Sequence, residues 1–100
     1  MTRPTLLPVN ELSEHLKDIP MWRLEGATIV REMPASDFAA AMGFVNAVAL
    51  LAEKADHHPD ILLYGWNKVR ITLSTHDQGG ITMADIRLAK EIDALRFNIV

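Results

Sequence analysis

Residues 68–75 alternate strictly between polar and apolar side chains, and this feature most restricts the possible fold. One set of alternate positions holds Val69, Ile71, Leu73 and Thr75, and the other holds Lys68, Arg70, Thr72 and Ser74. Successive side chains of a β-strand point to opposite faces, so the pattern predicts a strand with one buried and one solvated face. A sheet covered on one side only is typical of antiparallel strands.

Three further segments have the composition of short strands. Asp60–Tyr64 precedes the alternating run, and we centre the turn between the two on Asn67. Residues 21–25 and 27–33 lie on either side of Gly26, and the second of them holds three β-branched residues. Such residues are enriched in strands, and glycine favours the turn between them. The sequence therefore predicts four strands arranged as two hairpins.

Helical spacing of apolar residues precedes and follows the first hairpin. The first helix is short, and we expect it to be capped by Asn10 and ended by Pro20. The second is long and runs from a cap at Ser36 to about Asp56. Its apolar stripe consists of Phe38, Ala41, Met42, Val45, Val48, Ala49 and Ala52.

A last helix follows the second hairpin. Thr82 and Asp85 have the spacing of a capping box, and the stripe that follows consists of Ile86, Ala89, Ile92 and Ile99. Because helices separate hairpins and not single strands, the order α-β-β-α-β-β-α predicts an α+β fold. We expect a two-layer sandwich, with a four-stranded, mainly antiparallel sheet and helices on one face. Residues 1–100 are short enough to form a single domain.

The composition excludes several classes of protein. The chain has no cysteine, which excludes disulfide scaffolds, thiolate zinc sites and cysteine nucleophiles. It has 10 Lys and Arg against 13 Asp and Glu, with no basic stripe, so we expect no direct nucleic-acid binding. The N-terminus lacks a basic region followed by an apolar run, and we find no apolar stretch of about 18 residues. We therefore expect a cytoplasmic protein with no membrane partner.

Three of the four histidines flank the second hairpin. If the numbers of paired residues sum to about 134, twice the number of the turn centre, His58 faces His76 and Asp60 faces Ser74. His57 lies beside His58, so the two ends of the hairpin bring three imidazoles together. Imidazole titrates near neutral pH and is suited to proton transfer, which indicates an acid-base site.

Other interpretations of the same residues stay open. Three histidines can also bind zinc, but His57 and His58 would point in opposite directions on an extended segment, and we expect no metal. Trp66 is expected to pack on the hairpin, whereas Trp22 either packs in the core or forms a wall of a pocket for a flat heterocycle. Asp85 is most simply explained as a helix cap.

The spacing of these residues resembles the signature of the pterin-4a-carbinolamine dehydratase family. The signature combines an acidic or polar residue, a His-His-Pro triplet, an aromatic residue, a further histidine and an aspartate. In this chain these are Glu53, His57, His58, Pro59, Trp66, His76 and Asp85. The similarity extends from about Leu12 to Asp93 and so covers most of the chain.

The resemblance implies a hydro-lyase that removes water from 4a-hydroxytetrahydropterin, the spent cofactor of aromatic amino acid hydroxylases, and yields quinonoid dihydropterin. The catalytic residues it implies are His57, His58 and His76. The substrate contacts it implies are Pro59, Ser74, Thr75 and Asp77, to which we add Trp22 as a candidate wall of the pocket. It implies no cofactor or metal, and a homodimer or homotetramer. Some animal members also serve as dimerisation partners of a homeodomain transcription factor, so a protein-binding, transcriptional cofactor without catalysis is the alternative.

Overall fold

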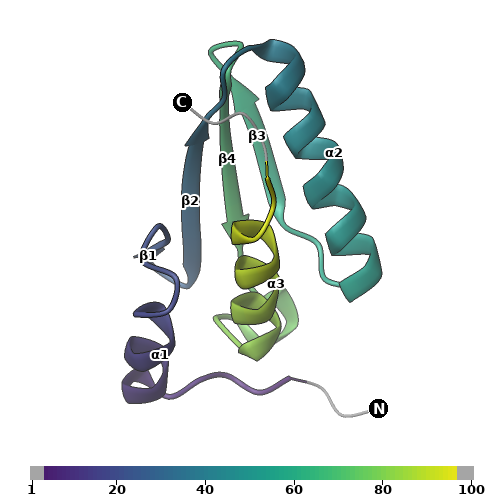
Figure 1. The fold of residues 1–100 in the computed structure, drawn as a ribbon. Coiled ribbons are helices and arrows are strands. Elements are labelled where there is room, and N and C mark those ends of the chain that lie inside the picture. The colour runs from purple at the N-terminus through teal and green to yellow at the C-terminus, as the bar shows by residue number, and fades with distance from the viewer. Residues whose placement is uncertain (1–3, 97–100) are drawn as a thin grey trace.

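A computed structural model describes residues 4–96 of the chain (Figure 1). In chain order the elements are α1 (Val9–Leu16), β1 (Arg23–Glu25), β2 (Thr28–Pro34), α2 (Phe38–Ala55), β3 (Asp60–Tyr64), β4 (Lys68–Leu73), the 3₁₀-helix η1 (His76–Gln78) and α3 (Met83–Asp93). The predicted order of helices and strands is therefore confirmed. Only η1, a short turn between β4 and α3, was not predicted.

The four strands form one sheet in the order β1-β2-β4-β3, and every neighbouring pair is antiparallel. The two hairpins join through β2 and β4, where Ile29 lies opposite Leu73 and Met33 lies opposite Val69. Figure 1 shows α2 and α3 side by side over the same face of the sheet. This confirms the α+β fold with an antiparallel sheet that is covered by helices on one side.

The predicted register of β3 and β4 is wrong by two residues. Asp60 lies opposite Thr72, not Ser74, and Tyr64 lies opposite Lys68. The turn is therefore centred on Trp66 and not on Asn67, whose side chain instead donates a hydrogen bond to the carbonyl of Ala35 at 3.0 Å. A shift by an even number of residues leaves every side chain on its predicted face, so the burial pattern of β4 is still correct.

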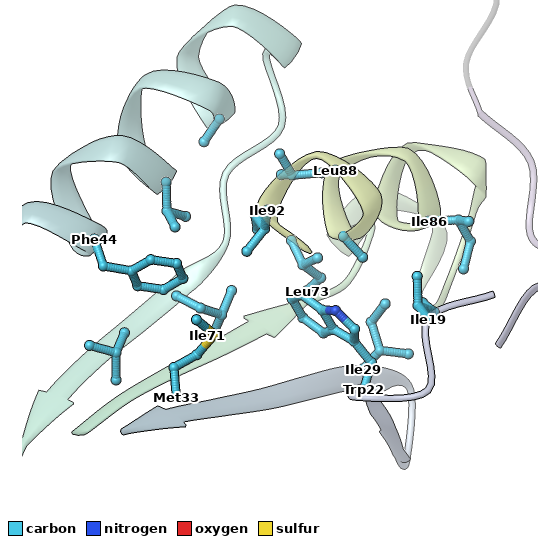
Figure 2. Close-up of a cluster of buried hydrophobic side chains, with 14 of the residues drawn as sticks. Ile19, Trp22, Ile29, Met33, Phe44, Ile71, Leu73, Ile86, Leu88 and Ile92 are labelled. Atoms are coloured by element: carbon cyan, nitrogen blue, oxygen red, sulfur yellow. The ribbon is translucent and has the colours of Figure 1, made fainter. Parts of the chain in front are cut away.

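The core lies between the sheet and the two helices that cover it (Figure 2). Val69, Ile71 and Leu73 of β4 are completely buried, as their alternation predicts. From β2 the core contains Ile29 and Met33, from α2 Ala41, Phe44, Val48 and Ala52, and from α3 Ile86, Leu88, Ala89 and Ile92. Apolar burial on this one face stabilises the fold.

The predicted apolar stripe of α2 is wrong in part. Phe38 and Met42 are 54% and 42% exposed, whereas Phe44, which lies outside that stripe, is 2% exposed. The helix is apolar on more than one side, so spacing alone could not show which side faces the sheet. Its cap is also one residue later than predicted, because the Asp37 carboxylate, not Ser36, accepts a hydrogen bond from the Ala40 N–H at 2.7 Å.

By length and composition, α2 could cross a membrane, which contradicts the expectation that no stretch is long and apolar enough. In the structure it packs on the sheet through Ala41, Phe44, Val48 and Ala52. The core helices of globular proteins often have this composition, so the helix is weak evidence of a membrane span.

The ends of the described chain also differ from the prediction. Pro8, not Asn10, is the cap residue of α1, and no side chain caps this helix. The helix ends at Leu16, ahead of Pro20, because a turn with a hydrogen bond from the Ile19 N–H to the Leu16 carbonyl follows it. Ile99, predicted for the stripe of the last helix, lies outside the described residues.

Candidate functional site

A pocket of about 290 Å³ lies where the chain enters β3 and leaves β4. Its lining residues are Asp56, His57, His58, Ser74, Thr75, His76 and Asp77. The three histidines therefore converge on one cavity, although His58 does not pair with His76 as predicted, because the pairing of β3 with β4 ends at Asp60 opposite Thr72. The volume is at the lower end of the range for small-molecule sites, and it suits a compact ligand.

The end of α2 places two of the histidines at this pocket. Asp56 adopts the left-handed conformation, with φ 51° and ψ 44°. The Asp56 N–H donates to the Glu53 carbonyl at 3.2 Å, and the His57 N–H donates to the Ala52 carbonyl at 3.1 Å. These two bonds form a Schellman motif, which ends a helix by turning the chain sharply. His57 and His58 are the first residues after that turn, so the helix end sets the position of their backbone.

His57 is held by a buried carboxylate. Its Nε2 lies 2.5 Å from Oδ1 of Asp85, which is completely buried. The other oxygen of Asp85 accepts hydrogen bonds from the Thr75 hydroxyl at 2.8 Å and from the Thr82 N–H at 2.9 Å. An ionised carboxylate only accepts, so against an ionised Asp85 the donor of this contact is Nε2 of His57.

Asp85 is thus more than the helix cap that its position predicts. The predicted capping box of α3 is present, because the Thr82 hydroxyl accepts from the Ala84 N–H at 3.2 Å while Asp85 accepts from Thr82. The same carboxylate also orients His57, 28 residues earlier in the sequence. The capping pattern alone could not reveal this second contact, which depends on how α3 packs beside the end of α2.

The third histidine comes from the loop after β4. The Thr75 N–H donates to the Gly80 carbonyl at 2.8 Å, which closes a short loop that contains η1. His76 and Asp77, the first two residues of η1, are exposed at the pocket. Ser74 is buried beside them, and its hydroxyl donates to the Ala27 carbonyl at 3.0 Å.

His58 has a different environment from His57. Its Nε2 lies 2.7 Å from Oε1 of Glu53, with the two side chains 60% and 75% exposed. A solvated contact of this kind contributes little stability. The two adjacent histidines therefore differ in kind, since one is fixed by a buried partner and the other is accessible to solvent.

Some predicted site residues do not line the pocket. Trp22 is 5% exposed and lies among the core side chains (Figure 2), where its indole N–H donates to Asp93 at 2.9 Å. Of its two interpretations, the structure supports core packing. Pro59 is half-buried and is not a lining residue. Trp66, expected to pack on the hairpin, is instead 62% exposed in the turn, with φ 59°.

Asp56 also lines the pocket, and the sequence did not predict it as a site residue. Its position just beyond the end of the long helix, directly before the two adjacent histidines, is the only signal that could have identified it. Within residues 4–96, no group of three or more His, Asp or Glu side chains is arranged to hold a metal ion. The pocket therefore offers imidazoles, hydroxyls and carboxylates, which are the groups used for proton transfer to and from a small polar molecule.

Comparison with known proteins identifies the family. The sequence profile of the family described as pterin 4 alpha carbinolamine dehydratase matches residues 5–95. A relative from Prochlorococcus marinus, provisionally named as a pterin-4-alpha-carbinolamine dehydratase, is 46% identical over 91% of this chain and 95% of its own. A relative from Acidobacterium capsulatum with the same provisional name is 50% identical over 84% of this chain and 90% of its own.

Solved structures agree with these sequence matches. A crystal structure from Brucella melitensis, described as a transcriptional coactivator/pterin dehydratase, has a TM-score of 0.82 and 38% identity, covering 88% of this chain and 95% of its own. A pterin dehydratase-like RuBisCO assembly factor of the alpha-carboxysome has a TM-score of 0.59 and 24% identity, over 73% of this chain and 83% of its own, which shows a shared fold only. The profile match over nearly the whole chain, the relatives and the site signature agree, and the chain belongs to the pterin 4 alpha carbinolamine dehydratase family.

Proposed function

We propose that this protein is a hydro-lyase that dehydrates 4a-hydroxytetrahydropterin to quinonoid dihydropterin. One observation carries the proposal: three imidazoles converge on one small pocket, and a buried carboxylate orients one of them. The family to which the chain belongs supplies the substrate class.

The reaction needs one proton donor and one proton acceptor. The bond between C4a and its hydroxyl oxygen breaks, the oxygen takes up a proton and leaves as water, and the electron pair of a ring N–H bond forms the new C=N bond. Neither step requires a metal or a nucleophile, and imidazoles near neutral pH can supply both protonation states.

The contacts of His57 suit it to act as the base. Asp85 accepts the proton of Nε2, which leaves Nδ1 of the neutral ring to accept the proton from the substrate. The imidazolium that forms is stabilised by the same carboxylate. Protonated His76 or His58 would donate to the departing oxygen. Ser74, Thr75 and Asp77 line the same cavity and would contact the substrate.

The proposal also covers the compartment of the enzyme, its oligomeric state and the source of its substrate. Residues 1–100 would act as one domain in the cytoplasm, as a homodimer or homotetramer, without a resident cofactor or metal. The pterin substrate would come from aromatic amino acid hydroxylases, whose spent cofactor the enzyme would recycle.

A protein-binding role is the second candidate, and two observations favour it. The similar protein from Brucella melitensis is described as a transcriptional coactivator as well as a pterin dehydratase. In this chain, the exposed side of α2 carries Phe38, Met42 and Leu50, which are 54%, 42% and 73% exposed. Exposed apolar residues of this kind are typical of contact surfaces between proteins.

A rate measurement tests the proposal. The 4a-hydroxytetrahydropterin is generated in the cuvette by a hydroxylase, and its loss is followed by ultraviolet absorbance with and without the pure protein. The dehydration also proceeds slowly without an enzyme, so the expected result is an acceleration of roughly 10²- to 10⁴-fold, in proportion to protein concentration. A rate equal to the spontaneous one, together with capture of a specific partner from extract of the source cells, would favour the protein-binding role.

A further inference from the structure

The loop that carries His76 is fixed mainly through its backbone. It runs from Thr75 to Gly80, and the Thr75 N–H donates to the Gly80 carbonyl at 2.8 Å. The N–H groups of Gln78 and Gly79 both donate to the Thr75 carbonyl at 3.0 Å. His76 and Gly79 are exposed, and Gln78 is only half-buried. Because side-chain burial within the loop is small, its position depends on the contacts made where it ends.

Residues 4–8, which precede α1, lie against that end of the loop. We call this segment the strap, and Figure 1 shows it passing below the start of α3. The Leu7 N–H donates to the Ile81 carbonyl at 2.9 Å. Leu6 covers Gly80 so closely that a Cβ atom added to the glycine would lie 2.9 Å from Leu6 Cδ2. Gly80 is accordingly buried, although the residue before it is exposed.

The strap is anchored separately from the loop. The Leu7 side chain is half-buried and packs against the hydrophobic core. The Pro8 carbonyl accepts from the Leu12 N–H at 2.9 Å, which joins the strap to α1. Leu6 is 49% exposed, so it contributes less to the core than a buried leucine does. The contact of Leu6 with the loop can therefore be weakened without removing the anchor of the strap.

From these contacts we infer that the strap positions His76 for catalysis, an inference that rests on the proposed function. A surface loop with little side-chain burial opens locally at a small cost in free energy. Each contact at its end raises that cost and keeps the imidazole at the pocket for more of the time. Proton transfer requires the imidazole within hydrogen-bond reach of the substrate, and small displacements slow it strongly. Leu6 is thus a positioning residue that acts through His76.

Leu6→Ala removes the cover of Gly80 and should make the loop more mobile. We expect kcat to fall roughly 3- to 30-fold, with little change in Tm. Amide hydrogen exchange at Gln78 and Gly79 should become faster, because their hydrogen bonds lie within the loop. In the His76→Ala background, Leu6→Ala should cause no further loss of kcat, since the group that it positions is then absent.

Gly80→Ala tests the same contact from the other side. The backbone of Gly80 lies outside the left-handed region, so alanine is tolerated there, but its methyl group displaces the Leu6 side chain. Gly80→Ala should therefore lower kcat as Leu6→Ala does. In the double variant the methyl group takes up space that Leu6 leaves, so the two losses should not add.

Leu24→Ala is the matched control. Leu24 is 48% exposed, almost the same as Leu6, and it lies in β1 and does not line the pocket. This variant should leave kcat and the exchange rates of the loop unchanged. A comparable loss of kcat in the control would show that truncation of any half-exposed leucine slows the enzyme, and the inference would be overturned.

The outcomes separate this inference from the proposed function. If the wild type accelerates dehydration, but Leu6→Ala and Gly80→Ala keep its kcat, only the inference is overturned. The same holds if Leu6→Ala lowers kcat equally with and without the His76 imidazole, because the strap then acts through another group. If the wild type does not accelerate dehydration, the proposed function is wrong and the inference falls with it.

Discussion

The imidazole of His57 and the carboxylate of Asp85 lie 2.5 Å apart at the centre of a network that joins three parts of the fold. Asp85 is completely buried in α3, and its other oxygen accepts from Thr75 at the end of β4 and from Thr82 at the start of α3. A buried carboxylate is costly unless its oxygens are hydrogen-bonded, and these partners satisfy both of them. The network therefore fixes the orientation of His57 as well as the helix start.

Asp85→Asn should impair catalysis more than it impairs folding. An amide has similar size, but its NH₂ group can point at Nε2 of His57 and so place the ring proton on Nδ1, which removes the proposed base. We expect kcat to fall roughly 10- to 1000-fold with a smaller change in KM. Stopped-flow rates and the pH profile of kcat check this.

Asp93→Asn is the control for that variant, because Asp93 lies at the other end of the same helix. It pairs with Arg31 and accepts from Trp22, and it lines no part of the pocket. Its loss should lower Tm and leave kcat unchanged. Equal losses of kcat in both variants would mean that Asp85 acts only through the stability of α3.

The solvated face of the sheet carries a pH-dependent contribution to stability. Glu32 accepts hydrogen bonds from the Tyr64 hydroxyl and, at 3.2 Å, from Arg23, and it lies 3.3 Å from Arg70. The hydrogen bond from Tyr64, followed by the charge of Arg70, lowers the pKa of Glu32 below its ordinary value of 4.5. A carboxylate with a depressed pKa in the folded state stabilises the fold above its unfolded pKa, and this stabilisation is lost as the pH falls through the folded pKa.

Glu32→Gln should therefore lower Tm at neutral pH, by no more than about 4 °C because the groups are solvated. The difference from the wild type should shrink as the pH falls below the ordinary pKa of 4.5 and disappear once the pH lies below the depressed pKa of Glu32 in the folded state. Thermal unfolding followed by circular dichroism across this range checks the prediction. A difference that stays constant with pH would show that Glu32 contributes through packing and not through its charge.

Removal of metal ions should leave the activity unchanged. The chemistry proposed for the three imidazoles transfers protons only, and adjacent His57 and His58 have different partners, Asp85 and Glu53. Elemental analysis of the purified protein, with dehydration rates before and after treatment with a chelator, checks this. Stoichiometric zinc whose removal abolishes turnover would instead favour a metal site.

The protein should be a homodimer or homotetramer in solution. The sheet has open edges at β1 and β3, and edge strands are commonly covered by a second copy or another element. Leu50 on α2 is 73% exposed and adds an apolar surface that a partner copy could cover. Light scattering at micromolar concentration should give at least twice the 11.2 kDa mass of the chain. A catalytically active species at the monomer mass would contradict the prediction.

The elements of the fold could be predicted because local patterns determine them. The alternation through Val69 and Ile71 identified the buried face of β4, and this survived a register error of two residues because the error was even. The buried face of α2 could not be predicted, since Phe38 and Phe44 are equally apolar and only the packing distinguishes them. Local pattern therefore determines element type, while tertiary contacts determine which apolar side faces inward.

One part of the candidate site could be predicted, because the two ends of a hairpin must lie close together. The convergence of His57 and His76 follows from the two ends of one hairpin. The contact between His57 and Asp85 could not be predicted, because it depends on the packing of α3 beside the end of α2. The spacing of Asp85 from Thr82 also already explained it as a helix cap. Trp22 was ambiguous for the same reason, because an indole fits a core as well as a pocket.

The most direct test of the account measures dehydration of 4a-hydroxytetrahydropterin by the wild type, His57→Ala, His76→Ala and the double variant, each shown to be folded by circular dichroism. If the pocket works by acid-base transfer between imidazoles, kcat/KM falls roughly 10- to 1000-fold in each single variant. The double variant should approach the spontaneous rate. A folded double variant that retains the full wild-type rate would show that the histidine pocket does not carry the reaction.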